Sequence, residues 1–176
     1  MRFAAELGWK EKIWTGVVGA GIVLFVVIAV GASGGNFRDA HFTVPIGILV
    51  VVLTIALGFR PIGYELDAQD LVVDRPFRAL SVPYSSIRAV RAPSEYPTIF
   101  TIGLWRAEGL FGSYGLYWNR PWGLFRVFVT DSSRLVEIVL EDGSRLVISP
   151  SGDPREFRDA LMARARLAGA EIAFAT

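Results

Sequence analysis

The chain contains no cysteine and only one histidine. Without cysteine it has no disulfide, no thiolate nucleophile and no zinc site built from cysteine and histidine. The single histidine, His41, lies in a short stretch between two apolar runs, where an ordinary loop residue is expected. The glycine spacings match neither a nucleophile elbow nor a nucleotide-binding loop. We therefore expect a protein that is not an enzyme and that holds no cofactor or metal.

Charge is absent from two long stretches, residues 13–32 and 42–59, which contain no Asp, Glu, Lys, Arg or His. About 20 apolar residues suffice for a helix to cross the hydrocarbon core of a bilayer. Neither stretch has the polar stripe of a soluble helix, and a signal peptide would have a shorter apolar region without a second one behind it. The sequence predicts a transmembrane hairpin over 13–59, with a cytoplasmic leader over 1–12.

Basic residues flank the predicted hairpin at both of its ends, namely Arg2, Lys10, Lys12 and Arg60. The connecting loop has one arginine beside one aspartate. Because basic flanks stay preferentially in the cytoplasm, we expect an integral membrane protein whose remaining chain, 60–176, is cytoplasmic. Gly16 and Ala20 have a small-xxx-small spacing, which favours packing of the two helices on each other over a dimer contact.

Short strand-like segments follow the hairpin, at about 64–66, 71–73, 78–82, 85–90, 125–129, 135–140 and 146–148. Asp142-Gly143 marks a hairpin turn between the last two. A helix is then predicted at about 153–168, with Asp153 as its N-cap and Pro154 in its first turn. Its apolar face comprises Phe157, Ala160, Leu161, Ala165 and Ala168. The pattern predicts an α+β protein in which a helix caps a small antiparallel β-barrel or sandwich.

Several motifs occur in order along this region: Leu71-Val72-Val73, Val82-Pro83-Tyr84-Ser85-Ser86-Ile87, Arg106 before a glycine-aromatic stretch, Phe128-Val129-Thr130-Asp131, Ile148-Ser149-Pro150 and Asp153-Pro154-Arg155-Glu156-Phe157. With them, the chain from Tyr64 to the end of the last helix resembles the bacterial pleckstrin-homology-like domains found behind one or two membrane helices. The resemblance implies a curled antiparallel sheet with a C-terminal helix at a bacterial inner membrane. It implies little about biochemical role.

Residues 96–125 form an unusual insert, rich in aromatic side chains and glycine. Two interpretations are open: the rings fill the end of the sandwich, or they lie at the level of the lipid headgroups. The candidate binding residues in this insert are Trp105, Arg106, Trp118, Arg120 and Trp122.

The charges after Phe59 balance, with 14 arginines against 14 acidic residues. This balance argues against nucleic acid as a partner, because a polyanion attracts a basic excess. The expected partners are the lipid bilayer and another protein. We interpret the chain as a membrane-tethered, non-enzymatic binding module at the cytoplasmic face. The alternative is an accessory subunit that stabilises a membrane enzyme or transport complex.

Overall fold

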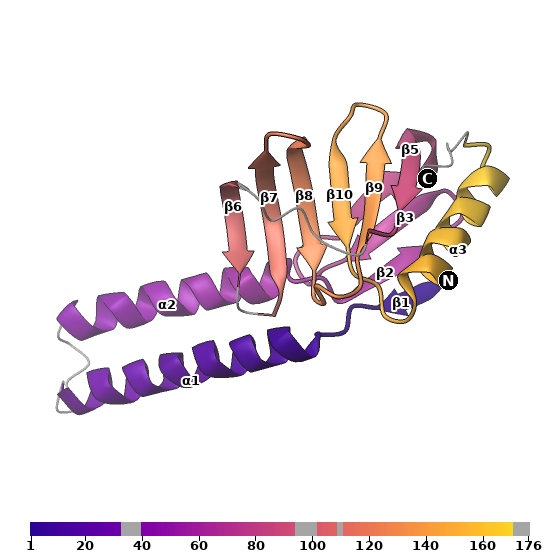
Figure 1. Ribbon diagram of the computed structural model, residues 1–176. Helices are drawn as coiled ribbons and strands as arrows, with labels where there is room; N and C mark the ends of the chain where they lie inside the picture. The colour runs from indigo at the N-terminus through magenta and orange to yellow at the C-terminus, as the bar shows by residue number, and fades with distance from the viewer. Residues whose placement is uncertain (33–39, 94–101, 109–110, 171–176) are drawn as a thin grey trace.

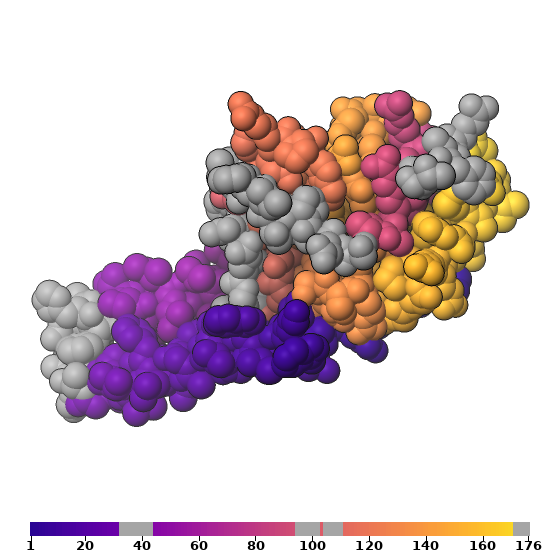
Figure 2. Space-filling model, in the orientation of Figure 1, coloured from indigo at the N-terminus to yellow at the C-terminus, as the bar shows by residue number. Residues whose placement is uncertain are grey.

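The computed structural model of the protein describes residues 1–32, 40–93, 102–108 and 111–170, with the side chains of that part except at 32, 40–43, 102 and 104–108. Two helices, α1 (Trp9–Ala32) and α2 (Ala40–Phe59), precede a β-sandwich and a C-terminal helix, α3 (Pro154–Leu167). Figure 1 shows α1 and α2 running side by side as an arm that projects from the sandwich. The space-filling view of Figure 2 shows the same arm extending well beyond the strands.

Of the helices that the structure describes, one is long and apolar enough to cross a membrane: Trp9–Gly31 within α1. Only 6% of the most apolar 18-residue stretch of this helix is buried within the protein, so it is not the core helix of a soluble domain. Because this helix lies near the N-terminus, its length and composition fit either a membrane anchor or a signal sequence. The described apolar part of α2, Val44–Phe59, is shorter than that length.

The two helices do not pack through their glycines. A methyl group added at Gly16, Gly19, Gly21, Gly31 or Gly47 would meet no described atom within 4 Å. Instead, an apolar groove of about 430 Å³ lies between the helices, lined by Val18, Gly21, Ile22, Phe25, Pro45, Ile48, Leu49 and Val52. The small-residue contacts predicted within the hairpin are therefore not made by these glycines.

The sandwich consists of two sheets. The first has the order β1-β2-β3-β4, from β1 (Arg2–Ala4), β2 (Gly63–Leu66), β3 (Asp70–Asp74) and β4 (Leu80–Pro83). A turn of 3₁₀ helix, Tyr84–Ser86, leads into the second sheet. That sheet has the order β5-β9-β10-β8-β7-β6, from β5 (Ile87–Arg91), β6 (Ile102–Glu108), β7 (Ser113–Asn119), β8 (Gly123–Val129), β9 (Val136–Leu140) and β10 (Arg145–Ile148). The expected sandwich is thus present.

The second sheet is mixed, whereas the sequence predicted an antiparallel one. β10 pairs with β9 as the expected hairpin, and Gly143 takes a positive φ of 80° in its turn. On its other side β10 pairs in parallel with β8, with Arg145 opposite Phe125. This arises because the chain leaves β8, skips one position to form β9, and returns as β10 into the gap.

The N-terminal leader is part of the sandwich. β1 pairs antiparallel with β2, with Phe3 opposite Tyr64. The Phe3 ring contacts the Phe157 ring of α3 edge-on, with centroids 4.8 Å apart. The segment 1–12, predicted as a cytoplasmic leader, contains an edge strand of three residues, and α1 begins within it at Trp9; its cytoplasmic location stays a prediction.

α3 closes the sandwich as predicted. The Asp153 carboxylate accepts a hydrogen bond from the Arg155 amide at 2.8 Å and caps the helix. Four side chains of α3 are buried: Phe157, Leu161, Met162 and Ala165. Ala168, predicted on the same face, follows the last helical turn and is exposed. The main core lies between the two sheets and α3, and includes Tyr64, Leu71, Val82, Ile138 and Ile148.

Candidate functional site

The sandwich caps the C-terminal end of α2. The last four carbonyl groups of a helix have no partner within it. Two of those in α2 are bonded by the sandwich: the Tyr114 hydroxyl donates to the Ala56 oxygen at 2.8 Å, and the Phe77 amide donates to the Gly58 oxygen at 3.1 Å. The Phe77 ring occupies the space that a side chain at position 58 would need, so glycine permits this close approach.

The sandwich also contacts the beginning of α1. Three hydrogen bonds of 3.0 Å each make this contact: Gly8 amide to Thr130 oxygen, Ser132 amide to Glu11 Oε1, and Phe111 amide to Thr15 Oγ1. Because both helices are fixed at their domain ends, the sandwich has a defined orientation on the arm. In Figure 1, β6 and β7 lie beside the end of α2, whereas β5 and α3 lie farthest along the domain.

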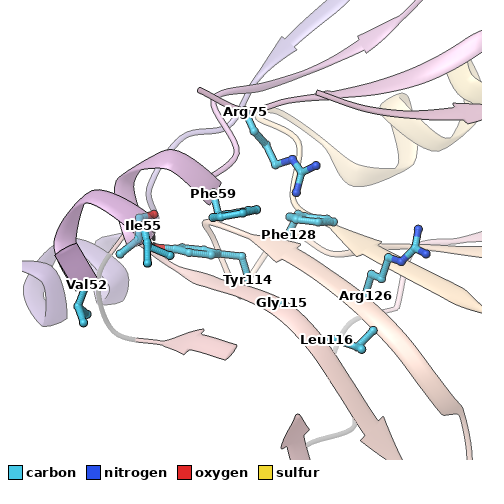
Figure 3. A pocket seen from close by; sticks show the side chains of 10 residues that line it. Val52, Ile55, Phe59, Arg75, Tyr114, Gly115, Leu116, Arg126 and Phe128 are labelled. Carbon is cyan, nitrogen blue, oxygen red and sulfur yellow. Dashed lines mark hydrogen bonds between the residues drawn. The ribbon is translucent and has the colours of Figure 1, made fainter. Parts of the chain in front are cut away.

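A cavity of about 630 Å³ opens where α2 meets the sheet. Its wall on the helix side is apolar and comprises Val52, Ile55, Ala56 and Phe59; the domain side comprises Arg75, Tyr114, Gly115, Leu116, Arg126 and Phe128. Figure 3 shows Val52 and Ile55 at one end and the two arginines at the other. The volume lies within the range of pockets that hold small organic ligands. The cavity is therefore amphipathic along its length.

Arg75 is the cation most closely built into this cavity. Its guanidinium lies 4.9 Å from the centre of the Phe128 ring and 5.8 Å from that of Phe59. Such stacking over aromatic faces stabilises a cation and fixes its orientation. The Arg75 Nε is buried and has no hydrogen-bond partner in the described part of the chain.

Three arginines gather near the domain end of the cavity. Burial lowers the pKa of Arg75, and the positive charges of Arg78 and Arg126 lower it further. Arg126 also acts on the exposed Asp142, whose pKa is lowered chiefly by hydrogen bonds from Ser144 and to a smaller degree by that arginine. Among the described residues, the lining contains no acidic side chain. An anion at this position would relieve the mutual repulsion of the cations.

Tyr114 lies in the wall of the cavity as a neutral phenol. Burial raises its pKa to about 12, although the nearby Arg60 opposes the shift. At neutral pH its hydroxyl therefore keeps its proton and donates it to Ala56. This residue serves the junction with α2 and is not a candidate acid or base.

The five residues predicted to form a binding surface lie near β6 to β8. The side chains of Trp105 and Arg106 are outside the described residues, although their backbone belongs to β6. Trp118 is 41% exposed on β7, and Arg120 is exposed in the turn that follows. Trp122 is partly buried in that turn. A binding role for these residues stays a prediction.

Trp122 has a packing role in the structure. Its ring contacts the Phe125 ring edge-on at 5.4 Å, and the Arg145 guanidinium lies over it at 4.9 Å. Arg145 in turn forms an ion pair with the buried Glu137. Buried rings of the same insert, those of Tyr117 and Phe125, belong to a second apolar cluster. Because side chains alternate along β8, Phe125 in this cluster and Phe128 in the main core lie on opposite faces of the second sheet. These rings are therefore buried on the outer face of the sheet and do not fill the end of the sandwich.

Sequence reasoning missed the cavity residues Arg75, Tyr114 and Arg126. In the sequence, Arg75 directly follows Asp74 in a stretch where arginines and aspartates alternate, a pattern typical of a solvated surface. Its position between two phenylalanines far from it in the chain, Phe59 and Phe128, depends on tertiary structure. One local signal was present: Arg75 directly precedes Pro76 at the end of a strand, where the chain leaves the sheet.

The described residues contain no group of three or more His, Asp or Glu side chains that could hold a metal ion.

A small two-sheet sandwich closed by a C-terminal helix and joined at one end to two apolar helices defines an α+β domain carried on an apolar arm. Residues 62–165 match the family model described as Bacterial PH domain. The match covers more than half of the chain, and the protein belongs to this family. No curated protein and no solved structure matches the chain.

Proposed function

We propose that the protein is a membrane-tethered, non-enzymatic PH module. In this proposal a two-helix transmembrane hairpin holds the sandwich at the cytoplasmic face of the bacterial inner membrane. There the sandwich engages lipid headgroups or a segment of a partner protein. The family gives the module its fold, and the features of this chain that support the rest are its helices and their junction with the sandwich.

The pairing of β1 with β2 is the observation that supports a hairpin topology. β1 precedes α1 and β2 follows α2, and the two strands are adjacent in one sheet. If α1 crosses the bilayer, the chain must therefore return to the side from which it came. α2 is the segment between them that can make this return, and its 20 residues span about 30 Å at 1.5 Å per residue.

The same pairing argues against cleavage of α1 as a signal sequence. Cleavage behind α1 would remove β1, and with it the Phe3 ring that contacts Phe157. It would also remove the Gly8 and Glu11 contacts to the sandwich. A retained anchor is consistent with these contacts. The basic residues Arg2, Lys10, Lys12 and Arg60 lie at the domain end of the arm, which favours a cytoplasmic sandwich.

Cysteine accessibility tests this topology directly, because the natural chain has no cysteine. Gly35→Cys places a thiol in the connection between the helices, and Arg155→Cys places one on the exposed side of α3. A membrane-impermeant maleimide added to intact bacterial spheroplasts should label the Gly35→Cys variant only. The Arg155→Cys variant should react after the membrane is permeabilised. The opposite pattern, or recovery of a shortened chain without α1, would overturn the proposal.

A second candidate function is an accessory subunit of a membrane complex. The observation that favours it is the apolar groove between α1 and α2, with the open space beside Gly21 and Gly47. Small residues permit close approach of another transmembrane helix. Gly21→Leu should then reduce the amount of partner recovered with the detergent-solubilised protein, as measured by cross-linking. An unchanged cross-linking pattern would count against this function.

A further inference from the structure

We infer that the cavity between α2 and strands β7 and β8 binds one anionic glycerophospholipid from the adjacent leaflet. Its phosphate lies between Arg75 and Arg126, and an acyl chain lies along Val52 and Ile55. The inference names a ligand for the proposed function and rests on the hairpin spanning the membrane.

The shape of the cavity supports an amphipathic ligand. The helix-side wall is formed by apolar side chains of α2, a helix that continues away from the sandwich into the arm. The cations are at the opposite end, on the domain side, as Figure 3 shows. From Val52 to Phe59 the helix rises by about 10 Å at 1.5 Å per residue. The polarity of the cavity thus runs in the same direction as that of a lipid in the leaflet.

The positive charge of the arginines in the lining favours an anionic ligand over a neutral one. Arg75 and Arg126 line the cavity, Arg78 acts on Arg75, and none of the lining side chains that the structure describes is acidic. Phosphate is recognised well by arginine because the guanidinium presents several donors in a planar fork. The Nε of Arg75 has no partner among the described residues but is buried, so it can donate to a phosphate only if the side chains around it shift. Arg126 is exposed and completes the site from β8.

The rest of the domain makes general electrostatic attraction a poor explanation for lipid binding. After Phe59 the arginines and the acidic residues are equal in number. A neutral domain has little long-range attraction to an anionic surface. Selectivity for an anionic lipid would therefore depend on this local site, and it should disappear when a few cavity residues are changed.

Native mass spectrometry tests the inference. The full chain is measured in detergent with either dioleoylphosphatidylglycerol or dioleoylphosphatidylcholine added. We expect one molecule of dioleoylphosphatidylglycerol to bind about tenfold more tightly than dioleoylphosphatidylcholine. A tenfold preference corresponds to about 1.4 kcal/mol, which a charge-assisted hydrogen bond can supply. Arg75→Gln with Arg126→Gln should abolish this preference. Arg158→Gln, which changes a partly exposed arginine on α3, should preserve it.

The apolar end is tested separately with Ile55→Trp, which fills the cavity and leaves both arginines in place. This variant should bind dioleoylphosphatidylglycerol at least severalfold more weakly than the natural chain does. Equal binding of the two lipids by the natural chain, or unchanged binding in either the arginine or the Ile55→Trp variant, would overturn the inference. Those results leave the topology untouched, because the proposed function fails only if the labelling of Gly35→Cys and Arg155→Cys is reversed or α1 is removed.

Discussion

The Tyr114 hydroxyl donates a hydrogen bond to the carbonyl oxygen of Ala56, a group at the end of α2 that has no partner within its helix. The two residues are 58 positions apart in the chain. Together with the bond from Phe77 to Gly58, this contact makes the sandwich the C-terminal cap of α2. A domain attached in this way transmits its orientation to the helix instead of swinging on a linker.

Replacing Tyr114 with phenylalanine should loosen this junction. The change removes one hydroxyl and leaves a buried carbonyl unpaired, which costs about 1–3 kcal/mol. We expect the melting temperature of the full chain in detergent to fall by several degrees, measured by tryptophan emission. Thr54→Val is the control, because the Thr54 hydroxyl bonds only to Val50 of its own helix at an exposed position. A Tyr114→Phe protein as stable as the control would contradict the capping role.

Two glycines of α2 should respond in opposite ways to alanine. At Gly47 a methyl group meets no described atom within 4 Å, so Gly47→Ala should leave stability unchanged or raise it by up to about 1 kcal/mol. At Gly58 the methyl group would overlap the Phe77 ring, so Gly58→Ala must displace this largely exposed ring and should lower the melting temperature modestly. Removing the ring as well, with Phe77→Ala, should recover part of the loss. Equal melting curves for the two alanine variants would show that Phe77 does not pack against α2.

Phe157 packs α3 against strands β1 and β2 of the first sheet. Its side chain is fully buried and contacts the rings of Phe3 in β1 and Tyr64 in β2. Phe157→Ala should cost about 3–5 kcal/mol, because it removes buried area and leaves a cavity. Arg158→Ala, one position along α3, loses only a surface pair with Asp159 and should cost less than about 1 kcal/mol. Chemical denaturation of both variants measures the difference, and similar losses would show that the buried face of α3 is misassigned.

Local patterns were sufficient to predict most of the sandwich. Alternation and turn residues located β3, β8, β9 and β10, and the pair Asp153-Pro154 located the start of α3. The two uncharged apolar runs, 13–32 and 42–59, likewise predicted both helices of the arm. These features depend on neighbours in sequence, which is why they can be read without the fold.

Pairings between distant segments could not be predicted. β1 has three residues and no pattern of its own; it is a strand because β2 offers it a free edge. The parallel pairing of β8 with β10 follows from the order in which strands are added, not from composition. The same holds for the cavity, where Phe59, Arg75 and Phe128 come from three separate elements.

Tyr64 should make the protein sensitive to alkaline pH. Burial raises its pKa to about 12 from 10, although hydrogen bonds with Ser149 and Thr130 partly oppose the shift. Its hydroxyl donates to the buried carbonyl of Phe128 at 2.7 Å, which only the protonated phenol can do.

A tyrosine whose pKa is higher in the folded state favours folding fully below the unfolded value, near pH 10. That contribution is lost as the pH rises from 10 towards 12, because the unfolded chain releases the proton first. The loss attributable to Tyr64 is about 1.4 kcal/mol per pH unit in this window. Tyr114, with its pKa also near 12, should add a loss of the same sign.

The measurement is the free energy of unfolding of the full chain in detergent at pH 8, 10 and 11, for the natural protein and for Tyr64→Phe. Tyr64→Phe should be less stable at pH 8, because the bond to Phe128 is lost, and should decline less steeply between pH 10 and 11. The two curves should therefore converge as the pH rises. Parallel curves would mean that Tyr64 ionises in the folded protein as readily as in the unfolded chain, and that its burial does not control the alkaline limit of stability.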